Sequence, residues 1–464
     1  MRSYLERSIL LCFTISLTAA LGCGGGGTST SSGGGASTST SGSAAGGGGA
    51  ASTSTSASTS TGSSVGGSGG GDTGPGDVGV WTDAPGACPA GIPKVDITTA
   101  AQLASAARGE DAFAGDAPST CYFLHNGTYK DNGVALYILK GGVAGGARRY
   151  FIGESRTGVI INSRGNIANG VGDVTIENLT MDLTGYPKNG EFDTLTVGKG
   201  KNITIDHVTF TGDCATGHKG GHIEPDGTQN LLVEACIIEK FGSCGVNGHE
   251  DHGIYIAAGS GLVIRNNIIR ENSSRGIQMY TQSGEFGTID DVLIERNLFQ
   301  KNGHGNQEDG LLVSSSGAGT ITKVTVQRNI FDRNWYSGIR FVGGTESAVV
   351  VTHNTFDGNS VGSTSVNRSD INVDTDADDK DGAAGTTFTA NIFNVGYTLI
   401  NDCFDGKARA FTFGDNFVNG KIATGAKGNC VGPQTLGDPQ FAGAATGDFH
   451  PKNAAAAAYG AYAP

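Results

Sequence analysis

The chain has 464 residues, of which 78 are glycine, 16% are charged and 7% are aromatic, and its formal net charge is −13. This glycine content disfavours an all-helical protein, and the negative charge disfavours nucleic acid as a partner, because phosphates bind basic surfaces. The length alone suggests about three domains, but no Phe, Tyr or Trp occurs between Phe13 and Trp81. A segment without large apolar side chains cannot offset the entropy of ordering. We therefore expect a Gly/Ser/Thr-rich disordered tether over residues 23–80 and one large domain over residues 81–464.

The first 22 residues have the pattern of an export signal. Arg2 and Arg7 are followed by an apolar stretch, Ile9 to Ala20, that is too short to span a bilayer comfortably. The sequence Ala20-Leu21-Gly22-Cys23 then resembles the lipobox of bacterial lipoproteins. The resemblance implies acylation of Cys23, and hence a bacterial envelope protein that is held on a membrane by this lipid and faces outward. The alternative is an ordinary secretory signal without a lipid.

The cysteines of the large domain agree with an oxidising compartment. No Cys-x-x-Cys pair with zinc spacing is present. Seven cysteines leave at least one without an intramolecular partner, and we expect that one to be Cys236, reduced and buried. The expected pairs are Cys88 with Cys121, Cys403 with Cys430, and Cys214 with Cys244.

An internal repeat organises the domain. Two copies of the repeat are Val292-Leu-Ile-Glu-Arg-Asn-Leu-Phe299 and Val324-Thr-Val-Gln-Arg-Asn-Ile-Phe331. The pattern of each copy predicts a strand, a turn and a second strand. Each repeat of roughly 30 residues also contains a third short strand, such as Gly276-Ile-Gln-Met279. Two columns of asparagine recur at the turns, where Asn tolerates left-handed angles and can hydrogen-bond to an identical neighbour about 4.8 Å away. The first column is Asn267, Asn297, Asn329, Asn354 and Asn391, and the second is Asn272, Asn302, Asn334 and Asn359.

Three short strands per repeat predict an all-β solenoid, a parallel β-helix. Neither a leucine-rich repeat line nor a propeller blade signature recurs. From Cys121-Tyr-Phe-Leu-His-Asn-Gly-Thr-Tyr129 to Gly437-Asp-Pro-Gln-Phe441 the sequence resembles the right-handed parallel β-helix superfamily of pectate lyases and related sugar-active proteins. We expect a single right-handed parallel β-helix over about residues 95–445, and we expect the protein to be a monomer.

Alignment of the third strands predicts which side chains share the outer face. With Ile223, Ile254 and Ile277 pointing inward, the next residue of each strand forms an outward column, because neighbouring coils are one strand spacing apart. This column is Glu224, Tyr255, Gln278, Leu312, Arg340 and Asn372. The positions two before the inward residues add His252, Arg275 and Asp309, and the loops that enter the strands add His249, Glu250, Asp251 and Glu308.

The resemblance implies a polysaccharide substrate and, in outline, the chemistry of alginate lyases and C5-epimerases, where a His and an Arg lie on neighbouring coils. A base removes the C5 proton of a uronic acid while a cation lowers that proton's pKa. We expect His252 or Tyr255 as the base, Arg275 or Arg340 beside the substrate carboxylate, and Glu224 and Asp251 in the same site. Gln278, His249 and Asp309 are expected to bind substrate. Calcium could supply the charge instead, held by Asp374, Asp376 and Asp378.

Two alternative functions are also consistent with the sequence. Glu224 and Asp251 could act together as a glycoside hydrolase pair. Asp290-Asp291 followed by Gly303-His304-Gly305 matches the order of polygalacturonase motifs, but no Arg-x-Lys follows, and the match is interpreted as a coincidence. The second alternative is a surface solenoid that binds glycans or mediates adhesion without catalysis.

Overall fold

The computed structural model describes residues 78–79, 81, 83–131, 133–186, 193–214, 220–242, 251–282, 287–303, 308–316, 319–343, 346–360, 363, 368–374, 385–400, 411–422 and 431–464. The export signal, Cys23 and nearly all of the expected tether lie outside these residues, as do His249, Glu250, Cys244, Cys403 and Cys430. No helix of the described part is long and apolar enough to cross a membrane.

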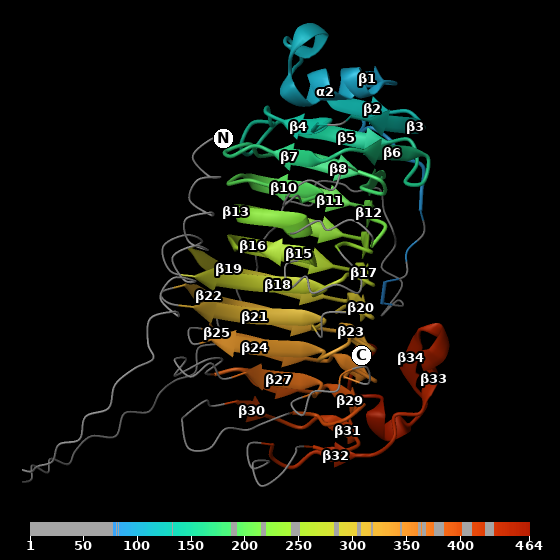
Figure 1. Cartoon of the computed structure of the whole chain (residues 1–464), viewed down its shortest axis with the longest axis vertical. Helices are drawn as coiled ribbons and strands as arrows, with labels where there is room; N and C mark the ends of the chain where they lie inside the picture. Colours follow the sequence, from blue (N-terminus) through green and yellow to red (C-terminus); the bar gives the residue numbers. More distant parts are fainter. Residues whose placement is uncertain are drawn as a thin grey trace, which may run out of the picture. The chain divides into compact units, whose positions relative to one another are not determined.

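The described domain is a right-handed parallel β-helix, as the sequence predicts (Figure 1). Its coils stack so that those in the middle of the described domain each contribute a strand to sheets A, B and C, and β13 belongs to both A and C. Sheet A consists of β1 Lys94–Ile97, β2 Cys121–Leu124, β5 Arg149–Gly153, β8 Val174–Glu177, β11 Lys201–Asp206, β13 Gly220–Glu234, β16 Ala258–Arg265, β19 Thr288–Glu295, β22 Thr320–Gln327, β25 Glu346–Thr352, β28 Thr387–Thr389 and β30 Thr412–Phe413. Sheet B consists of β3 Gly127–Lys130, β6 Val159–Asn162, β9 Thr180–Asp182, β12 Thr209–Thr211, β14 Ile237–Glu239, β17 Ile268–Arg270, β20 Leu298–Gln300, β23 Ile330–Asp332, β26 Thr355–Asp357, β29 Ile392–Asn394, β31 Phe417–Asn419 and β32 Thr435–Leu436. Sheet C consists of the first part of β13 with β4 Leu136–Ile138, β7 Gly165–Ile167, β10 Leu195–Val197, β15 Asp251–Ile256, β18 Ile277–Gln282, β21 Leu311–Ser316, β24 Ile339–Gly343 and β27 Ile371–Asp374.

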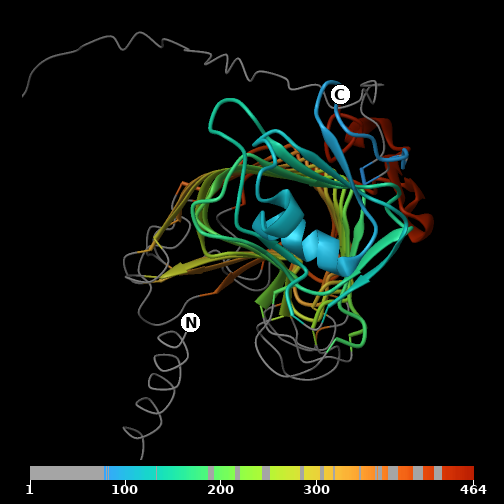
Figure 2. The same ribbon diagram turned by 90° about the horizontal axis from the view of Figure 1, so that it is seen from above.

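One helix, α2 (Ala100–Arg108), covers the N-terminal end of the coil stack (Figure 2). Thr99 and Gln102 form a capping box at its start, and Gly109 ends it in the left-handed conformation at φ 65°. Leu103, together with Ala106 and Ala107, is buried in the main hydrophobic core. The helix therefore closes an end that would otherwise expose the apolar interior.

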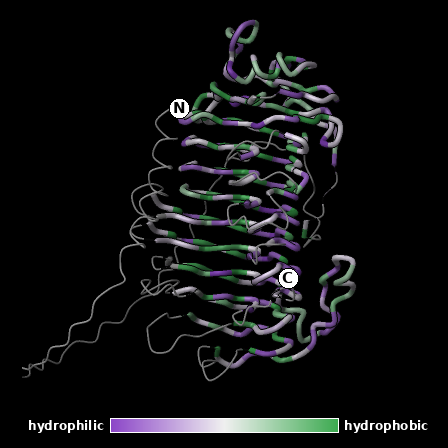
Figure 3. The backbone as a smooth tube through the Cα atoms, in the orientation of Figure 1, coloured by the Kyte–Doolittle hydropathy of each residue, from purple (hydrophilic) through white to green (hydrophobic). Residues whose placement is uncertain are grey.

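Apolar and polar residues follow one another along the strands (Figure 3), and the apolar side chains are the buried ones, so the core runs along the inside of the stack. Phe299, Phe331, Phe356 and Phe393 stack face to face, with ring centroids 4.6, 4.9 and 4.7 Å apart along the series. These spacings match the separation of neighbouring strands, and phenylalanine occupies the same position on four consecutive coils.

Both asparagine columns form hydrogen-bonded ladders. In the first, Asn297 donates from its backbone N and its Nδ2 to Oδ1 of Asn329, each at 2.9 Å. The ladder runs two steps beyond the predicted column, through Asn416, and ends where that residue donates to Oε1 of Gln434. The predicted stacking is confirmed, and it satisfies polar groups that would otherwise be buried without partners.

The left-handed residue at these turns is not the ladder asparagine. Positive φ angles occur at the preceding position, at Arg296 (55°), Arg328 (55°) and His353 (53°). Long side chains are uncommon in this conformation. The ladder asparagine instead turns its amide into the core, and its hydrogen bonds hold the corner.

Two peripheral segments lie on the outer surface of sheet B. The C-terminal part forms the antiparallel pair β33 (Phe441–Gly443) and β34 (Asp448–Pro451), and Phe449 and Ala461 pack in one cluster with Ile330. Val78 belongs to the same cluster. A second segment, here called the strap (residues 78–79, 81 and 83–87), leads from there to the N-terminal coils, where Gly86 donates to the carbonyl of Glu154.

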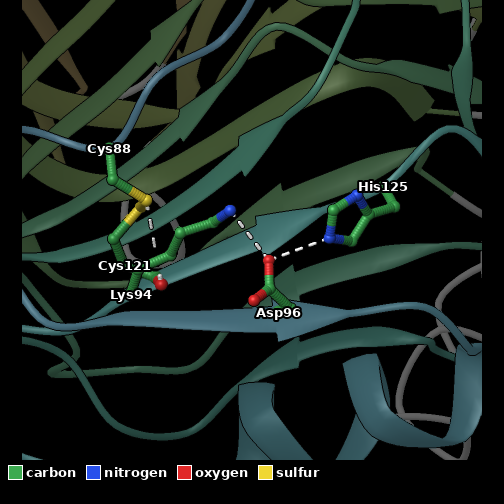
Figure 4. Close-up of a disulfide and its surroundings, with 5 residues drawn as sticks. All are labelled: Cys88, Lys94, Asp96, Cys121 and His125. Atoms are coloured by element: carbon green, nitrogen blue, oxygen red, sulfur yellow. Dashed lines mark hydrogen bonds and ion pairs between the residues drawn. A yellow bond between two sulfur atoms is a disulfide. The ribbon is translucent and has the colours of Figure 1, made fainter.

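The disulfides agree with expectation where they are described. Cys88 and Cys121 are bonded, with Cα atoms 5.8 Å apart, so the end of the strap is fixed to β2 beside Lys94, Asp96 and His125 (Figure 4). Cys236 is free and buried, as predicted. Cys214 is disulfide-bonded; its partner lies outside the described residues, so the pairing with Cys244 stays a prediction.

Candidate functional site

The predicted outward column exists with the predicted register. Tyr255 pairs with Gln278, Gln278 with Leu312, and Leu312 with Arg340 on successive strands of sheet C. Glu224 follows Ile223, which pairs with Ile254, so it stands next to Tyr255. The inward residues of these strands are fully buried, which fixes the outward direction of the column. The column continues toward the N-terminus through Thr196, Asn166 and Tyr137.

Glu224 shares a hydrogen bond with Asp193, a residue that the prediction did not include. Burial, followed by the hydrogen bond to Asp193 and its negative charge, raises the pKa of Glu224 to about 10. Asp193 also accepts hydrogen bonds from the backbone N of Gly221 at 3.0 Å and from Oγ1 of Thr196 at 3.1 Å. Glu224 therefore carries a proton at neutral pH, and its single O–H is directed to Asp193 within this carboxyl pair on the outer face of sheet C.

Asp193 could have been found from the sequence. It stands two positions before the inward residue Leu195, and this is the same position that His252 and Arg275 occupy in later coils. The predicted column began one coil too late, at Gly221. A second omission is Tyr280, a half-buried residue two positions after Gln278 in β18, whose hydroxyl lies 3.4 Å from Oγ of Ser316.

His252 packs against Tyr255, with ring centroids 5.6 Å apart. Tyr255 is half-buried in the outward column, whereas His252 is only 2% exposed. The two residues lie together, as predicted, but His252 is buried, whereas the prediction placed it on the solvated face. Of this pair, Tyr255 is the better placed to reach a ligand.

Arg275 and Asp309 also lie beside the outward column, but both are buried in a cluster of charges. Arg275 donates from Nη1 to Oε1 of Gln278 at 2.6 Å and forms an ion pair from Nη2 to Oε2 of Glu308 at 2.5 Å. Its Nε lies 3.8 Å from Oδ2 of Asp309. Burial lowers the pKa of Arg275, and the two carboxylates oppose that shift.

Arg340 is the second cation of this cluster. Its Nη1 lies 3.6 Å from Oε2 of Glu308 and 3.8 Å from Oδ2 of Asp309, and its guanidinium lies 5.4 Å from the centre of the Tyr336 ring. Burial raises the pKa of Asp309 to about 7, against the effect of both arginines, and Ser337 donates a hydrogen bond to it. Two arginines therefore face two acidic groups, whereas the sequence suggested cations on a solvated face.

The carboxyl groups of the predicted hydrolase pair come from neighbouring coils. Asp251 aligns with Gly220, four residues before Glu224 along the strand, but the Glu224 side chain reaches back, with Oε2 3.6 Å from where a Cβ on Gly220 would lie. The offset along the strand therefore does not set the distance between the two carboxyl groups. Glu224 and Asp193 are in hydrogen-bond contact, which is closer than the separation of about 5 Å or more between the carboxyls of glycosidases. Asp290 accepts from Oγ1 of Thr322 and pairs with Lys323 at 3.1 Å, and Asp291 is a left-handed turn residue at φ 57°, which supports coincidence for this motif.

No group of three or more His, Cys, Asp or Glu side chains within the described residues is arranged to hold a metal ion. Asp374 ends β27, but its side chain lies outside the described part, as do Asp376, Asp378, His249 and His304. The calcium expectation therefore stays untested.

Comparison with known proteins addresses the fold. Residues 148–322 match the family model described as right handed beta helix region. Comparison with curated proteins gives no match. Among solved structures, an alginate lyase from a Paenibacillus species is 13% identical, with a TM-score of 0.40 over 74% of this chain and 98% of that chain. The A-module of a mannuronan C-5 epimerase from Azotobacter vinelandii is 16% identical, with a TM-score of 0.44 and the same coverage. A surface adhesin of Streptococcus pneumoniae is 14% identical, with a TM-score of 0.39 over 73% and 81% of the two chains. By its repeat, its register and the family-model match over residues 148–322, the described domain has the fold of a right-handed parallel β-helix.

Proposed function

We propose that the protein acts on a uronic-acid polysaccharide by β-elimination, at the outward face of sheet C around Tyr255. The observation that carries the proposal is the position of Tyr255 between the protonated carboxyl pair of Glu224 and Asp193 on one neighbouring coil and the amide of Gln278 on the other. Neighbouring coils are about 4.8 Å apart, so all three side chains can contact one sugar ring.

The proposed roles follow from the chemistry of each group. Tyr255, ionised to the phenolate, takes the C5 proton of the uronate and becomes the phenol, the electrons of the C5–H bond form a double bond between C4 and C5, and the bond from C4 to the glycosidic oxygen breaks. Glu224 gives its proton to that departing oxygen. Gln278 donates from its amide to the substrate carboxylate, which stabilises the negative charge that develops there.

Hydrolysis by Glu224 and Asp251 is the alternative, and it would release a product without a double bond. An epimerase would use the same C5 proton and return a proton to the opposite face of the ring, without a double bond. The similar solved structures include lyases, an epimerase, a glucanase and an adhesin by title, and they do not separate these activities.

The test is an ultraviolet assay for unsaturated uronates on alginate, pectate and glycosaminoglycans, each with calcium and with a chelator. We expect absorbance to rise on at least one substrate, and Tyr255→Phe to lower the rate at least a hundredfold. Tyr137→Phe is the matched control, because Tyr137 lies in the same outward column on an earlier coil. A Tyr137 variant as inactive as the Tyr255 variant would contradict the assignment.

Two further results would replace the proposal. Deuterium incorporation at C5 without an unsaturated product would identify an epimerase. Binding of a neutral glycan, with no change in any uronate, would identify a binding module. Loss of activity in the chelator arm alone would support a calcium role for Asp374, Asp376 and Asp378.

A further inference from the structure

The cluster formed by Arg275, Glu308, Asp309 and Arg340 has a consequence for the residue beside it, Gln278. Side-chain exposure is 10% for Arg275, 4% for Glu308 and 0% for Asp309. Because the acidic groups face the guanidiniums inside the protein, Arg275 is already balanced by Glu308 at 2.5 Å. A buried cation that lost this partner would bear a large desolvation cost. Arg275 therefore does not need a substrate carboxylate for compensation.

A contact of Arg275 that leads out of the cluster is the 2.6 Å hydrogen bond to Oε1 of Gln278. A glutamine amide has an acceptor and a donor end of nearly the same shape, so an unrestrained side chain can present either. The guanidinium accepts no hydrogen bonds, so it selects the orientation in which the oxygen of Gln278 points toward it. The amide nitrogen then points away from the cluster.

We propose that Arg275, held by Glu308, is a positioning residue that fixes the amide of Gln278 with its N–H groups toward the carboxylate of a uronate bound beside Tyr255. The inference rests on the proposed function and adds the group that recognises the acid. A cation behind the amide also polarises its N–H groups, which strengthens hydrogen bonds to an anion. The opposite orientation would aim the amide oxygen at the carboxylate and repel it.

The inference predicts discrimination between charged and esterified sugars. Binding of a uronate trisaccharide and of its methyl ester should be measured by calorimetry, so that the result does not depend on turnover. The test variant is the double substitution Arg275→Met with Glu308→Gln, which removes one positive and one negative charge together. Single variants would leave a buried charge uncompensated and could fail to fold.

The matched control is Arg265→Met with Glu234→Gln. This pair, at 2.8 Å, also joins consecutive coils, but it lies on sheet A and does not contact Gln278. The test variant should bind the acid at least tenfold more weakly than the parent and the ester less than twofold more weakly, and Gln278→Leu should show the same pattern. The control should bind both ligands like the parent. Thermal melting shows whether each variant is folded.

Equal weakening for acid and ester, or none for either, in a folded test variant would overturn the positioning role. If the parent binds the acid through Gln278 but produces no unsaturated or epimerised sugar, the positioning role stands and the proposed reaction is wrong. If the parent binds no uronate while it acts on a neutral glycan, both are wrong.

Discussion

Asn359 donates a hydrogen bond from Nδ2 to Oδ1 of Asp370 at 3.0 Å, so the second asparagine ladder ends in a carboxyl group. Asp370 is 1% exposed, and burial raises its pKa well above the ordinary range, although the hydrogen bond from Asn359 opposes the shift. The carboxyl group therefore holds its proton in the folded protein over a pH range where the unfolded chain has lost it.

Asp370→Asn should make the protein more stable, and the gain should grow as pH rises. Folding raises the pKa of Asp370. Its contribution to the free energy of unfolding is therefore fully present below the pKa of the unfolded chain, about 4, and is lost as pH rises toward the pKa in the folded protein. The asparagine variant has no such loss, and its amide has the size of the carboxyl. Melting temperatures of parent and variant between pH 4 and 8 measure the effect. Asp290→Asn is the control of opposite sign, because Thr322 and Lys323 lower the pKa of Asp290. A gain for Asp370→Asn that does not change with pH would contradict the account.

Asn329→Ala should lower the free energy of unfolding by about 3 kcal/mol, because it leaves buried donors without an acceptor. The backbone N and Nδ2 of Asn297 both lose Oδ1 of residue 329. Denaturant unfolding measures the change. Asn419→Ala is the comparison: its half-buried amide donates to Oδ1 of Asn394 at 2.8 Å, and the expected loss is about 1 kcal/mol or less. Similar losses of unfolding free energy in the two variants would mean that the buried ladder hydrogen bonds stabilise the protein no more than the half-buried hydrogen bond of Asn419 does.

Under the proposed reaction, activity should fall at alkaline pH as Glu224 loses its proton, with a midpoint near its pKa of about 10. Asp193→Asn should move this midpoint to lower pH, because it removes the neighbouring negative charge that favours the protonated form of Glu224. Glu224→Gln should lower kcat strongly with little change in KM, since the amide keeps the hydrogen-bonding shape but has no acidic proton. The pH–rate profiles of the three proteins are the measurement. An unchanged alkaline midpoint in Asp193→Asn would exclude Glu224 as the proton donor.

Cys23→Ser should release the protein from membranes, since a thioether-linked lipid cannot form on serine. The expected result is recovery of the variant in the soluble fraction, whereas the parent sediments with the envelope. Mass spectrometry of the mature N-terminus distinguishes acylation at Cys23 from cleavage by an ordinary signal peptidase. A parent protein without lipid would contradict the anchor.

The repeat made the fold and the register predictable. Alternation around Ile223, Ile254 and Ile277 is strict, because a shift by one residue would move every apolar side chain out of the core. The state of the side chains on the outer face was not predictable in the same way. His252, Arg275 and Asp309 lie where the alignment put them, but their burial depends on how charged groups from different coils pack together. The pairing of Arg275 with Glu308 joins residues 33 positions apart, and no periodic pattern encodes it.

The strap determines how tension would enter the molecule. A pull on the chain ahead of Val78 acts first on the contacts along sheet B, where Gly79 lies over Ile268 and Leu298, and next on the contacts of Trp81 and Asp83 with Arg156. These contacts can separate one after another, and the ten positions from 78 to 87 extend by at most about 35 Å. The covalent bond between Cys88 and Cys121 then stops the extension. The load then passes to β2, whose neighbours in sheet A are β1 and β5.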